Sequence, residues 1–447
     1  MLVLRGFLFA HHLFIIFRKR KHIPLFRDVM NCAITKNDAS LPLNTIQTVN
    51  KIMQLVRQVQ FKRLKLLDEI TFLSKNLFNV ATYTVRQRFF KERYWIRYHE
   101  LWRLLKSHES YQKLQEACGS HPPQQVLKQV DRNFKSFFNA IKTWKHDPSK
   151  FQGMPKPPHY KRKNGRNLVY FTSLQCRLKD GFVLLTQKME RLGFPKIKTT
   201  LKSVKGVRIV PFGDRYNIEL IYDYEPRDLH LNEDNVLGID LGLNNIVTAS
   251  DNIGNKPMII KGGVIKSINQ FYNKQLAKYK SVSKICNNTE VTKRILKFNR
   301  KRNNKIRDFF HKTSRKVVNY CISNDIGTIV VGYNEGWKQG ISIGKRSNQN
   351  FVSVPFLKLV QQIEYKSEMV GIKVVRITEE YTSQACSSCG VVRKSNRKYR
   401  GLYVCKDCGV VLNADVNASK NIIQKGVPES KWIGDRGCLS HPIVLKI

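Results

Sequence analysis

Two pairs of cysteines near the C-terminus constrain the fold of this chain more than any other feature. Cys386 and Cys389 form one C-x-x-C pair, Cys405 and Cys408 form the second, and residues 390–404 lie between them. A glycine follows each pair and permits a tight turn. This spacing brings four thiolates around one tetrahedral zinc ion. Because four thiolates leave no open ligand position, we expect the zinc to be structural.

The charge of the chain predicts a polyanionic partner. Lysine and arginine number 79 against 33 acidic residues, which gives a formal net charge of +46. Such a charge is costly in self-repulsion unless a polyanion neutralises it, so nucleic acid is the expected partner. A ribosomal or merely basic protein is the alternative, but the 42% hydrophobic content favours folded domains over a basic tail.

The N-terminal segment begins with an apolar run, residues 6–17, that two histidines interrupt. The run is too short to cross a bilayer, and its charges follow it rather than precede it, so we expect neither a signal peptide nor a membrane partner. We interpret residues 1–40 as an extension, with disorder as one alternative. The six cysteines outside the two pairs are scattered, which is typical of reduced thiols in a cytosol-like compartment.

The spacing of apolar residues changes at two points in the sequence. From about 45 to 145, apolar residues recur at three- and four-residue spacing among lysines and arginines, which predicts a basic helical bundle. Prolines and glycines follow residue 152, and short alternating segments up to about 225 predict a small antiparallel β unit, which we interpret as a barrel. From 236 onward, apolar strands alternate with helices, including a long basic helical stretch over 265–321. This pattern predicts a mixed sheet covered by helices.

Two carboxylates stand at positions suited to metal binding. Asp240 ends an apolar strand in GIDLG, and Asp415 begins a helix in ADVNASKNII. Taken singly, the first is a common turn former and the second a favourable charge at a helix N-terminus. Together they could hold a pair of divalent cations, as many enzymes that hydrolyse phosphodiesters do. A third acid is then expected.

Four segments carry a family resemblance. They are GIDLGLNNIVTASDN, IVVGYNEGWKQG, EYTSQACSSCG and YVCKDCGVVLNADVNASKNI. Their order resembles the RuvC-like and zinc-ribbon segments of the TnpB family, transposon-encoded relatives of type V CRISPR effectors and of Fanzor proteins. The resemblance covers about 152–424 and is most specific after 236. It implies an RNase H-like domain in which two aspartates and a glutamate hold magnesium, and a guide RNA that directs DNA cleavage.

The resemblance implies a multidomain α+β fold: an N-terminal helical bundle, a β-barrel wedge, and an RNase H-like (RuvC) α/β domain with an inserted four-cysteine zinc ribbon. The expected divisions are 1–40, an extension; 41–150, a helical recognition lobe with part of the wedge; 151–230, the β-barrel wedge; 231–385, the RuvC-like nuclease domain; 386–410, the zinc ribbon; 411–426, the end of the RuvC-like domain; and 427–447, a C-terminal tail.

The resemblance makes Asp240 the first catalytic acid and Asp415 the last. The middle acid departs from the family pattern, because Gly332 stands where a glutamate is common. Without a substitute, the protein would bind DNA without cutting it.

Four glutamates are candidates for the missing acid. Glu335 falls in an expected loop, and Glu364 lies on an amphipathic helix where a solvated face is the simpler interpretation. Glu379 and Glu380 end a strand immediately before the ribbon, from which a carboxylate could reach the same metals. We favour Glu379, with Glu380 second, so that Asp240, Glu379 and Asp415 are the expected magnesium ligands.

Basic residues between the first two motifs, and in the ribbon, are candidates for nucleic-acid binding. A basic helix can follow a phosphate backbone, and exposed tyrosines can stack on single-stranded bases. The candidates are Lys293, Arg294, Arg300, Lys301, Arg302, Arg307, Lys312, Arg315, Arg397, Tyr399 and Arg400.

The sequence therefore predicts a TnpB-type RNA-guided DNA endonuclease with structural zinc, catalytic magnesium, a guide RNA, and a DNA target in double- and single-stranded form. We expect one protein copy per ribonucleoprotein, located at the nucleoid of a prokaryote or in the nucleus if the homologue is eukaryotic or viral. The alternatives are a nuclease-inactive RNA-guided DNA-binding repressor and a zinc-ribbon DNA-binding accessory to transposition.

Overall fold

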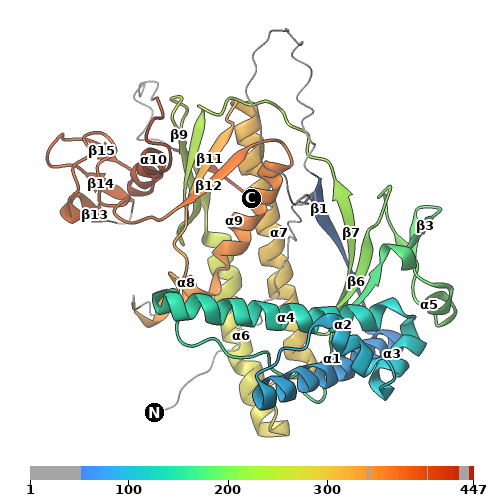
Figure 1. Cartoon of the computed structure of the whole chain (residues 1–447). Coiled ribbons are helices and arrows are strands. Elements are labelled where there is room, and N and C mark those ends of the chain that lie inside the picture. The colour runs from blue at the N-terminus through green and yellow to red at the C-terminus, as the bar shows by residue number, and fades with distance from the viewer. Residues whose placement is uncertain (1–51, 340–341, 343, 400, 432–441) are drawn as a thin grey trace, which may run out of the picture. The chain divides into compact units, whose positions relative to one another are not determined.

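The computed structural model describes residues 52–447 except 340, 341, 343, 400 and 432–441. The chain forms two compact units, one ending at Glu225 and the other beginning at Pro226 (Figure 1). The extension predicted over 1–40 lies outside the described residues.

The first unit combines helices with short antiparallel strands. Its helices are α1 (Lys65–Glu92), α2 (Tyr98–Leu105), α3 (Glu109–Cys118), α4 (His121–His146) and α5 (Gln187–Arg191). Its strands are β1 (Met53–Phe61), β2 (Val169–Thr172), β3 (Arg177–Lys179), β4 (Phe182–Leu184), β5 (Ile197–Lys198), β6 (Gly206–Phe212) and β7 (Arg215–Tyr224).

The helical pattern predicted from about residue 45 is wrong for β1. This segment pairs antiparallel with β7 along its whole length, from Met53 opposite Tyr224 to Phe61 opposite Tyr216. Its sequence, MQLVRQVQF, alternates apolar and polar residues as well as carrying helical spacing. Its pairing with β7, far along the chain, makes the segment a strand and not a helix, because tertiary pairing overrides local propensity.

The β strands of this unit form two sheets. Strands β1, β7, β6 and β2 lie in that order in one antiparallel sheet, and β3, β4 and β5 form a second. The antiparallel arrangement predicted from the alternating segments is confirmed. The predicted barrel is not confirmed, since the described strands make two separate sheets.

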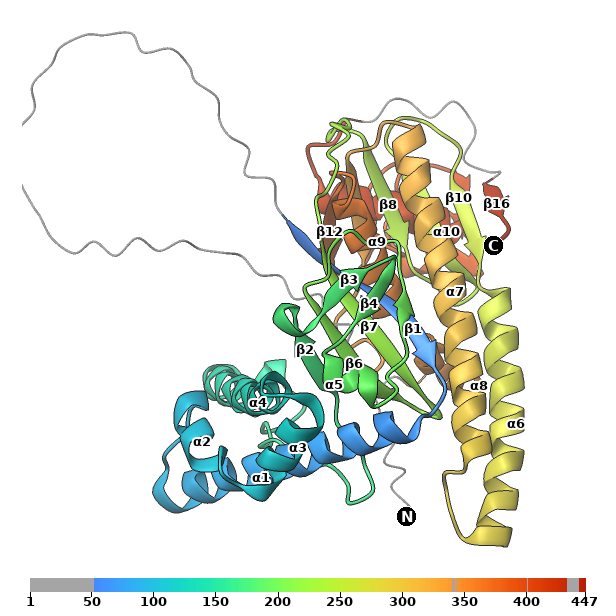
Figure 2. The ribbon, with the colours of Figure 1, turned by 90° about the vertical axis from the view of Figure 1, so that its right-hand side faces the viewer.

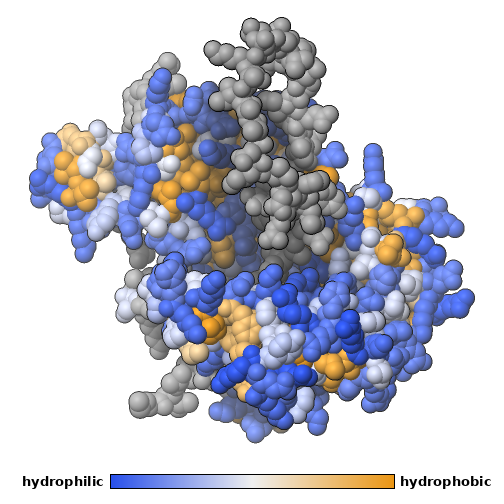
Figure 3. Space-filling view, in the orientation of Figure 1, coloured by the Kyte–Doolittle hydropathy of each residue, from blue (hydrophilic) through white to orange (hydrophobic). Residues whose placement is uncertain are grey.

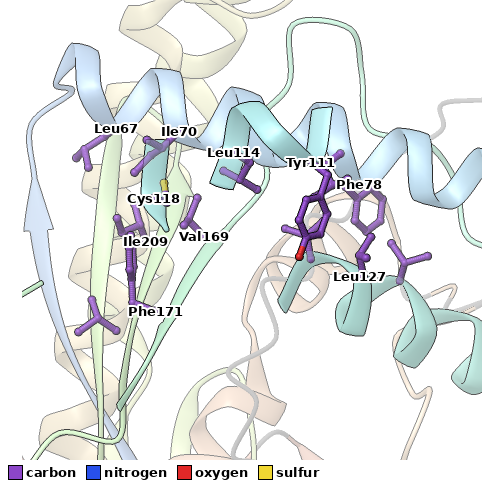
Figure 4. Packing of buried hydrophobic residues seen from close by; sticks show 14 of the residues in the cluster. Leu67, Ile70, Phe78, Tyr111, Leu114, Cys118, Leu127, Val169, Phe171 and Ile209 are labelled. Atoms are coloured by element: carbon purple, nitrogen blue, oxygen red, sulfur yellow. The ribbon is translucent and has the colours of Figure 1, made fainter. Parts of the chain in front are cut away.

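A shared hydrophobic core joins the helices to the larger sheet (Figure 4). Leu67 and Ile70 of α1 lie near Val169 and Phe171 of β2, and Leu114 of α3 belongs to the same cluster. These side chains are almost completely buried. The burial of one stripe of α1 explains its three- and four-residue periodicity.

The proline-rich segment after residue 152 lies along α1 instead of forming regular structure. Lys75 Nζ donates to the carbonyl of Lys163 at 2.9 Å, and Arg86 donates to the carbonyl of Pro158 at 2.9 Å. Asn79 both donates to and accepts from the backbone of Lys161. Side chains of α1 thus provide hydrogen-bond partners for backbone groups of this segment, which pairs with none of the described strands.

The second unit alternates strands and helices, as predicted. Its strands are β8 (Val236–Asp240), β9 (Asn245–Asp251), β10 (Met258–Lys261), β11 (Thr328–Gly332), β12 (Lys373–Ile377), β13 (Arg397–Tyr399), β14 (Leu402–Val404), β15 (Val411–Leu412) and β16 (Ile443–Leu445). Its helices are α6 (Gly263–Asn287), α7 (Lys293–Ser323), α8 (Lys345–Ser353), α9 (Phe356–Glu368) and α10 (Ala414–Gly426).

A six-stranded mixed sheet forms the centre of this unit, with strand order β12-β11-β8-β9-β10-β16. Strands β8, β11 and β12 are parallel, whereas β9 runs antiparallel to both β8 and β10. Strand β16, within the predicted C-terminal tail, extends the sheet by pairing parallel to β10 (Figure 2). The carboxyl ends of β8, β11 and β12 consequently meet at one edge.

Both faces of the central sheet are covered. Leu237 and Val331 belong to a large core with α7 and α9, whereas Val236 and Val330 pack against Ile422 of α10. The long basic stretch predicted over 265–321 is two helices, α6 and α7, which lie side by side (Figure 2).

Hydrophilic side chains occupy most of the surface visible in Figure 3. Among the described helices, none combines the length and the apolar character needed to cross a membrane.

Candidate active site and four-cysteine cluster

Asp240 is the last residue of β8, a central strand between β9 and β11. Burial raises the pKa of Asp240 well above its ordinary value, the carboxylates of Glu379 and Asp415 raise it further, and Arg397 lowers it. The influence of these groups shows that residues from three distant parts of the sequence meet at the end of β8.

Glu379 comes two residues after the end of β12. Its backbone N–H donates to Asn334 Oδ1 at 2.8 Å, and its carbonyl accepts from Thr382 Oγ1 at 2.9 Å. The side-chain Oε1 atom is buried and has no hydrogen-bond partner among the described residues. Burial raises the pKa of Glu379 to about 7.

Gly332 explains how Glu379 reaches this position. It ends β11, opposite Ile377 of the neighbouring parallel strand β12. A Cβ atom at residue 332 would lie 2.7 Å from Glu379 Cγ, 2.9 Å from Glu379 Oε1 and 2.7 Å from Ile422 Cδ1. The glutamate side chain therefore occupies the space above the glycine. The absence of a side chain at 332 and the presence of a carboxylate at 379 are parts of one arrangement.

Asp415 is the second residue of α10. Asn413 caps the helix, since its Oδ1 accepts from the backbone N–H of Asp415 at 3.0 Å and of Val416 at 3.3 Å. The two carboxylate oxygens of Asp415 have different partners. Asn245 Nδ2 donates to Oδ2 at 2.7 Å, and Arg397 Nη2 donates to Oδ1 at 3.3 Å.

Sequence reasoning missed Asn245 and assigned Arg397 a more general role. Asn245 begins β9 and is buried, so its pairing with Asp415 could be recognised only from the tertiary structure. Arg397, predicted to bind nucleic acid, lies on β13 beside the acids. Its side chain is 36% exposed, and its positive charge lowers the pKa of Asp240.

The other three candidate glutamates lie elsewhere. Glu380 is exposed, and its backbone carbonyl accepts from Lys425 Nζ at 3.2 Å. Glu364 is paired with Arg376, whose Nη2 donates to Oε2 at 2.6 Å. Glu335 is exposed in a turn after β11. Of the substitutes considered for position 332, Glu379 is the one that influences Asp240.

The four cysteines form a compact cluster. Their sulfur atoms all lie within 4.8 Å of one another, with 3.7 Å between Cys386 and Cys408 and 3.6 Å between Cys389 and Cys405. Within the described parts of the chain, this is the one group of at least three cysteine, histidine or acidic side chains that is so close. The carboxylates of the candidate active site are not part of this group.

The two cysteine turns have the same backbone geometry. Gly390 N donates to the carbonyl of Cys386 at 2.9 Å, and Gly409 N donates to that of Cys405 at 3.1 Å. Both glycines have positive φ angles, 76° and 71°, as the sequence predicted for tight turns. The backbone N–H of Cys408 also lowers the pKa of Cys405 to about 7, which favours the thiolate.

Two buried asparagines of α10 connect the cysteine-bearing segment to the helix that carries Asp415. Asn417 Nδ2 donates to the carbonyl of Ala385 at 2.7 Å, and its Oδ1 accepts from Ser387 N at 2.9 Å. Asn421 Nδ2 donates to the carbonyls of Thr382 and Ala385. Figure 1 shows the small β13–β15 sheet beside α10. The segment that begins the cluster is thus fixed to the helix that carries Asp415.

The predicted nucleic-acid residues on α7 differ in their environment. Arg302 donates to Asn269 Oδ1 at 2.7 Å and to the carbonyl of Ser353 at 2.6 Å, and Arg300 is buried with 9% exposure. The Arg302 guanidinium is thus engaged by other elements, and Arg300 exposes little surface to a phosphate. Arg307 is partly buried. The remaining α7 candidates are exposed, namely Lys293, Arg294, Lys301, Lys312 and Arg315.

Exposed candidates also lie on the ribbon. Tyr399 on β13 has 75% of its surface exposed, as a stacking residue requires. Arg400 lies outside the described residues.

Two protein-family models match the chain. Residues 219–338 match a model described as "Probable transposase", and residues 356–422 match "Cas12f1-like, TNB domain". The first includes Asp240 and Gly332, and the second includes Glu379, the four cysteines and Asp415.

Curated relatives come from bacteria, an archaeon and viruses. The chain is 32% identical to the CRISPR-associated endodeoxyribonuclease Cas12f1 of Sulfoacidibacillus thermotolerans, over 48% of this chain and 53% of that protein. It is 26% identical to the putative RNA-guided DNA endonuclease InsQ of Escherichia coli, over 69% of this chain and 74% of that protein. The chain spans about half the length, or less, of the first curated relatives that it matches.

The fold is similar to that of a solved Cas12f1 in complex with single guide RNA and target DNA. The TM-score is 0.52 at 15% identity, and the alignment covers 79% of this chain and 81% of the other. The relationship to the TnpB family that the motifs predicted is confirmed by the matched models and relatives.

Proposed function

We propose that this relative of the TnpB family is an RNA-guided DNA endonuclease, which hydrolyses DNA phosphodiesters beside a short flanking motif. The observation that carries the proposal is the meeting of Asp240, Glu379 and Asp415 next to the four-cysteine cluster. The names of the relatives, an endodeoxyribonuclease and a putative RNA-guided DNA endonuclease, support the same chemistry.

The fold supports a matching assignment of domains. The strand order of the central sheet, with one antiparallel strand beside three parallel ones, suits an RNase H-like (RuvC) domain. The cysteine-bearing sheet lies in sequence between β12 and α10, as a zinc ribbon inserted into that domain would. We assign the recognition lobe and the wedge to the first unit.

The donor set at the acidic site suits magnesium. Carboxylate oxygens are the ligands that this cation prefers. Burial raises the pKa of Asp240, the nearby like charges raise it further, and Glu379 Oε1 is buried without a partner in the described chain. A bound cation would favour the ionised form of Asp240 and would give Glu379 Oε1 a partner. Asp240, Glu379 and Asp415 would hold it, and when bound it would activate water and stabilise the leaving oxygen.

The chain's own residues would orient the DNA strand. Arg397 places a guanidinium beside Asp415, where it can bind a phosphate oxygen of the strand to be cut. Tyr399 lies on the same short strand and is exposed enough to stack on a base. Glu379 lies above Gly332, and its burial keeps water away from its carboxylate.

The cysteine cluster would hold one zinc ion in a structural role. Four sulfur ligands fill a tetrahedral zinc completely, so no position remains for water or substrate. The small β13–β15 sheet has few buried apolar residues of its own. Its stability therefore depends on the metal.

Guide RNA and target DNA would neutralise the net charge of +46. Exposed lysines and arginines of α7 are available for this, and base pairing would supply most of the sequence specificity. We infer one protein copy per ribonucleoprotein. It would act where its DNA lies, at the nucleoid of a prokaryotic host or in the nucleus of a eukaryotic one.

The decisive experiment is cleavage by the protein purified after co-expression with its native flanking DNA. The complex is given magnesium and a target library with randomised flanks, with the Asp240→Ala variant beside it. We expect cleavage by the wild type alone and RNA binding by both, because the substitution removes a metal ligand and no phosphate contact. Cleavage by the variant at the wild-type rate would exclude Asp240 from catalysis.

A second function, RNA-guided DNA binding without cleavage, is favoured by one observation. Gly332 stands at the strand end where a glutamate is expected. RNA-dependent binding of the target without any cutting would establish that function, and would mean that Glu379 does not replace the missing acid.

A further inference from the structure

Asn245 makes the shortest hydrogen bond between any described side chain and Asp415. Its Nδ2 lies 2.7 Å from Asp415 Oδ2, although 170 residues separate the two in sequence. Asn245 is only 7% exposed. This contact therefore links the start of β9 to the start of α10 in a region from which water is largely excluded.

The chemistry of the pair fixes the orientation of the amide. A carboxylate only accepts hydrogen bonds, so the NH2 group of Asn245 must face Asp415. The carbonyl end, Oδ1, is then buried without a hydrogen-bond partner among the described residues. An asparagine selected for stability alone would satisfy both ends of its amide, since an unpaired buried carbonyl is unfavourable. The amide is oriented by the carboxylate instead.

The backbone holds Asn245 firmly. The turn from β8 to β9 is so tight that a Cβ atom at Gly242 would lie 2.7 Å from the carbonyl of Asn245. Gly262 N donates to the carbonyl of Asn244 at 2.7 Å, and Asn245 itself pairs with Lys261 of β10. A side chain on such a backbone can define the rotation of a carboxylate, which a mobile loop could not.

The two oxygens of Asp415 are consequently unequal. Asn245 donates to Oδ2, whereas Oδ1 accepts from the exposed Arg397 at 3.3 Å. The arginine contact is longer and comes from the ribbon, so Oδ1 is the oxygen that can change partners.

We propose that Asn245 is a positioning residue for Asp415: its amide holds Oδ2 and thereby directs Oδ1 towards the divalent cation. This inference rests on the proposed function, because it assumes that Asp415 is a metal ligand. It assigns a role to the start of β9, the strand that follows the one carrying Asp240.

The test is the binding of Mn²⁺, measured by electron paramagnetic resonance on the full-length protein after nucleic acid has been removed in high salt. Partners that orient metal ligands typically contribute about 10–100-fold to metal affinity. We expect Asn245→Ala to weaken Mn²⁺ binding by about that factor. The matched control is Asn244→Ala, an exposed neighbour whose Oδ1 pairs with Lys266, and it should bind Mn²⁺ like the wild type.

A double variant separates positioning from direct ligation. If Asn245 acts through Asp415, adding Asn245→Ala to Asp415→Asn should weaken Mn²⁺ binding no further. A full additional loss would show that Asn245 contacts the cation itself and would overturn the positioning role. Thermal unfolding monitors folding of each variant, and Asn245→Ser, which cannot reach Asp415, replaces the alanine variant if that one unfolds.

The remaining outcomes separate this inference from the proposed function. Wild-type Mn²⁺ affinity in a folded Asn245→Ala protein overturns the inference, while the cleavage assay and the proposed function stand. A wild-type protein that binds no Mn²⁺ at this site, or an Asp240→Ala protein that binds it equally well, overturns the metal site and the inference together.

Discussion

The thiol cluster and the carboxylate site are both connected to α10 but are built in opposite ways. The four cysteines come from two turns of identical backbone geometry, and their sulfurs already converge within 4.8 Å. The three acids come from the end of β8, the segment after β12 and the start of α10. They are brought together by the central sheet and α10, where Glu379 and Asp415 influence Asp240.

The two sites also differ in how their surroundings shift the pKa values of their side chains. At the cysteine turns, backbone N–H groups lower the pKa of Cys405 to about 7, whereas burial raises the pKa of Cys386 to about 12. At the acidic site, burial and like charges raise the pKa of Asp240, and burial raises that of Glu379. Local backbone groups thus favour one thiolate of the cluster, whereas at the acidic site both carboxylates with shifted pKa values are unfavourable in their ionised form unless a cation binds. We therefore expect loss of the first metal to affect folding and loss of the second to affect catalysis.

The largest effect that would sharpen this contrast is expected from Glu379→Gln. The amide keeps the shape of the side chain but removes a charged ligand. Because even an outer partner of a metal ligand is worth about 10–100-fold, we expect cleavage to fall by at least about 100-fold with folding intact. The matched control is Glu380→Gln, an exposed neighbour, which should cut within about threefold of the wild type. If the control loses activity and Glu379→Gln does not, the assignment of the middle acid is wrong.

Removal of one sulfur ligand should act on structure instead. We expect Cys405→Ser to reduce bound zinc from about one ion per chain to nearly none and to unfold the β13–β15 sheet, since a site of this kind folds with its metal. Cys286→Ser, at an exposed cysteine outside the cluster, should retain its zinc. Metal analysis and amide hydrogen exchange measure both results. A full equivalent of zinc in Cys405→Ser would contradict the four-cysteine site.

The contrast also explains what could be predicted from the sequence. The cysteine turns are local, so spacing and the glycines after each pair were sufficient. The apolar strands β8, β11 and β12 and the helix that starts at Asp415 were likewise recognisable, because each is a continuous periodic segment. Asp240 and Asp415 could be named from their positions at the ends of such segments.

The parts that sequence reasoning missed depend on distant partners. Strand β1 carries helical spacing, and only its ladder to β7 makes it a strand. Asn245 resembles any turn asparagine until Asp415 is placed beside it. Arg302 resembles its exposed neighbours on α7, but its acceptors belong to α6 and to the end of α8.

A methyl group at Gly332 should break the arrangement of the acidic site without removing an acid. In Gly332→Ala the new Cβ would overlap Glu379 and Ile422, both within 2.7 Å, so one of them must move. We expect the free energy of unfolding to fall by about 1–3 kcal/mol, as for other overpacked cores, together with a loss of cleavage. Gly263→Ala is the control, because a Cβ atom there meets nothing within 4 Å. Equal stability and activity in the two variants would show that Glu379 does not depend on the glycine.

The smallest expected effect is the pH dependence of stability in magnesium-free buffer. Glu379 has a pKa of about 7 in the folded protein, above its ordinary value of 4.5, so the folded state binds its proton more tightly than the unfolded state. Its contribution to stability is therefore complete below pH 4.5 and is lost as the pH rises through 7. Between about pH 6 and pH 8 this amounts to roughly 1 kcal/mol.

Glu379→Gln should remove that part of the slope in urea unfolding, because the amide does not titrate, whereas Glu380→Gln should keep it. Saturating magnesium should flatten the wild-type slope as well, since a bound cation stabilises the ionised carboxylates that the proton otherwise neutralises. A slope that is identical in the wild type and in Glu379→Gln would mean that this carboxylate is solvated like any surface acid. The pKa of Glu379 would then be ordinary. The raised pKa of Asp240 would be the remaining electrostatic difference between the acidic site and the thiol cluster.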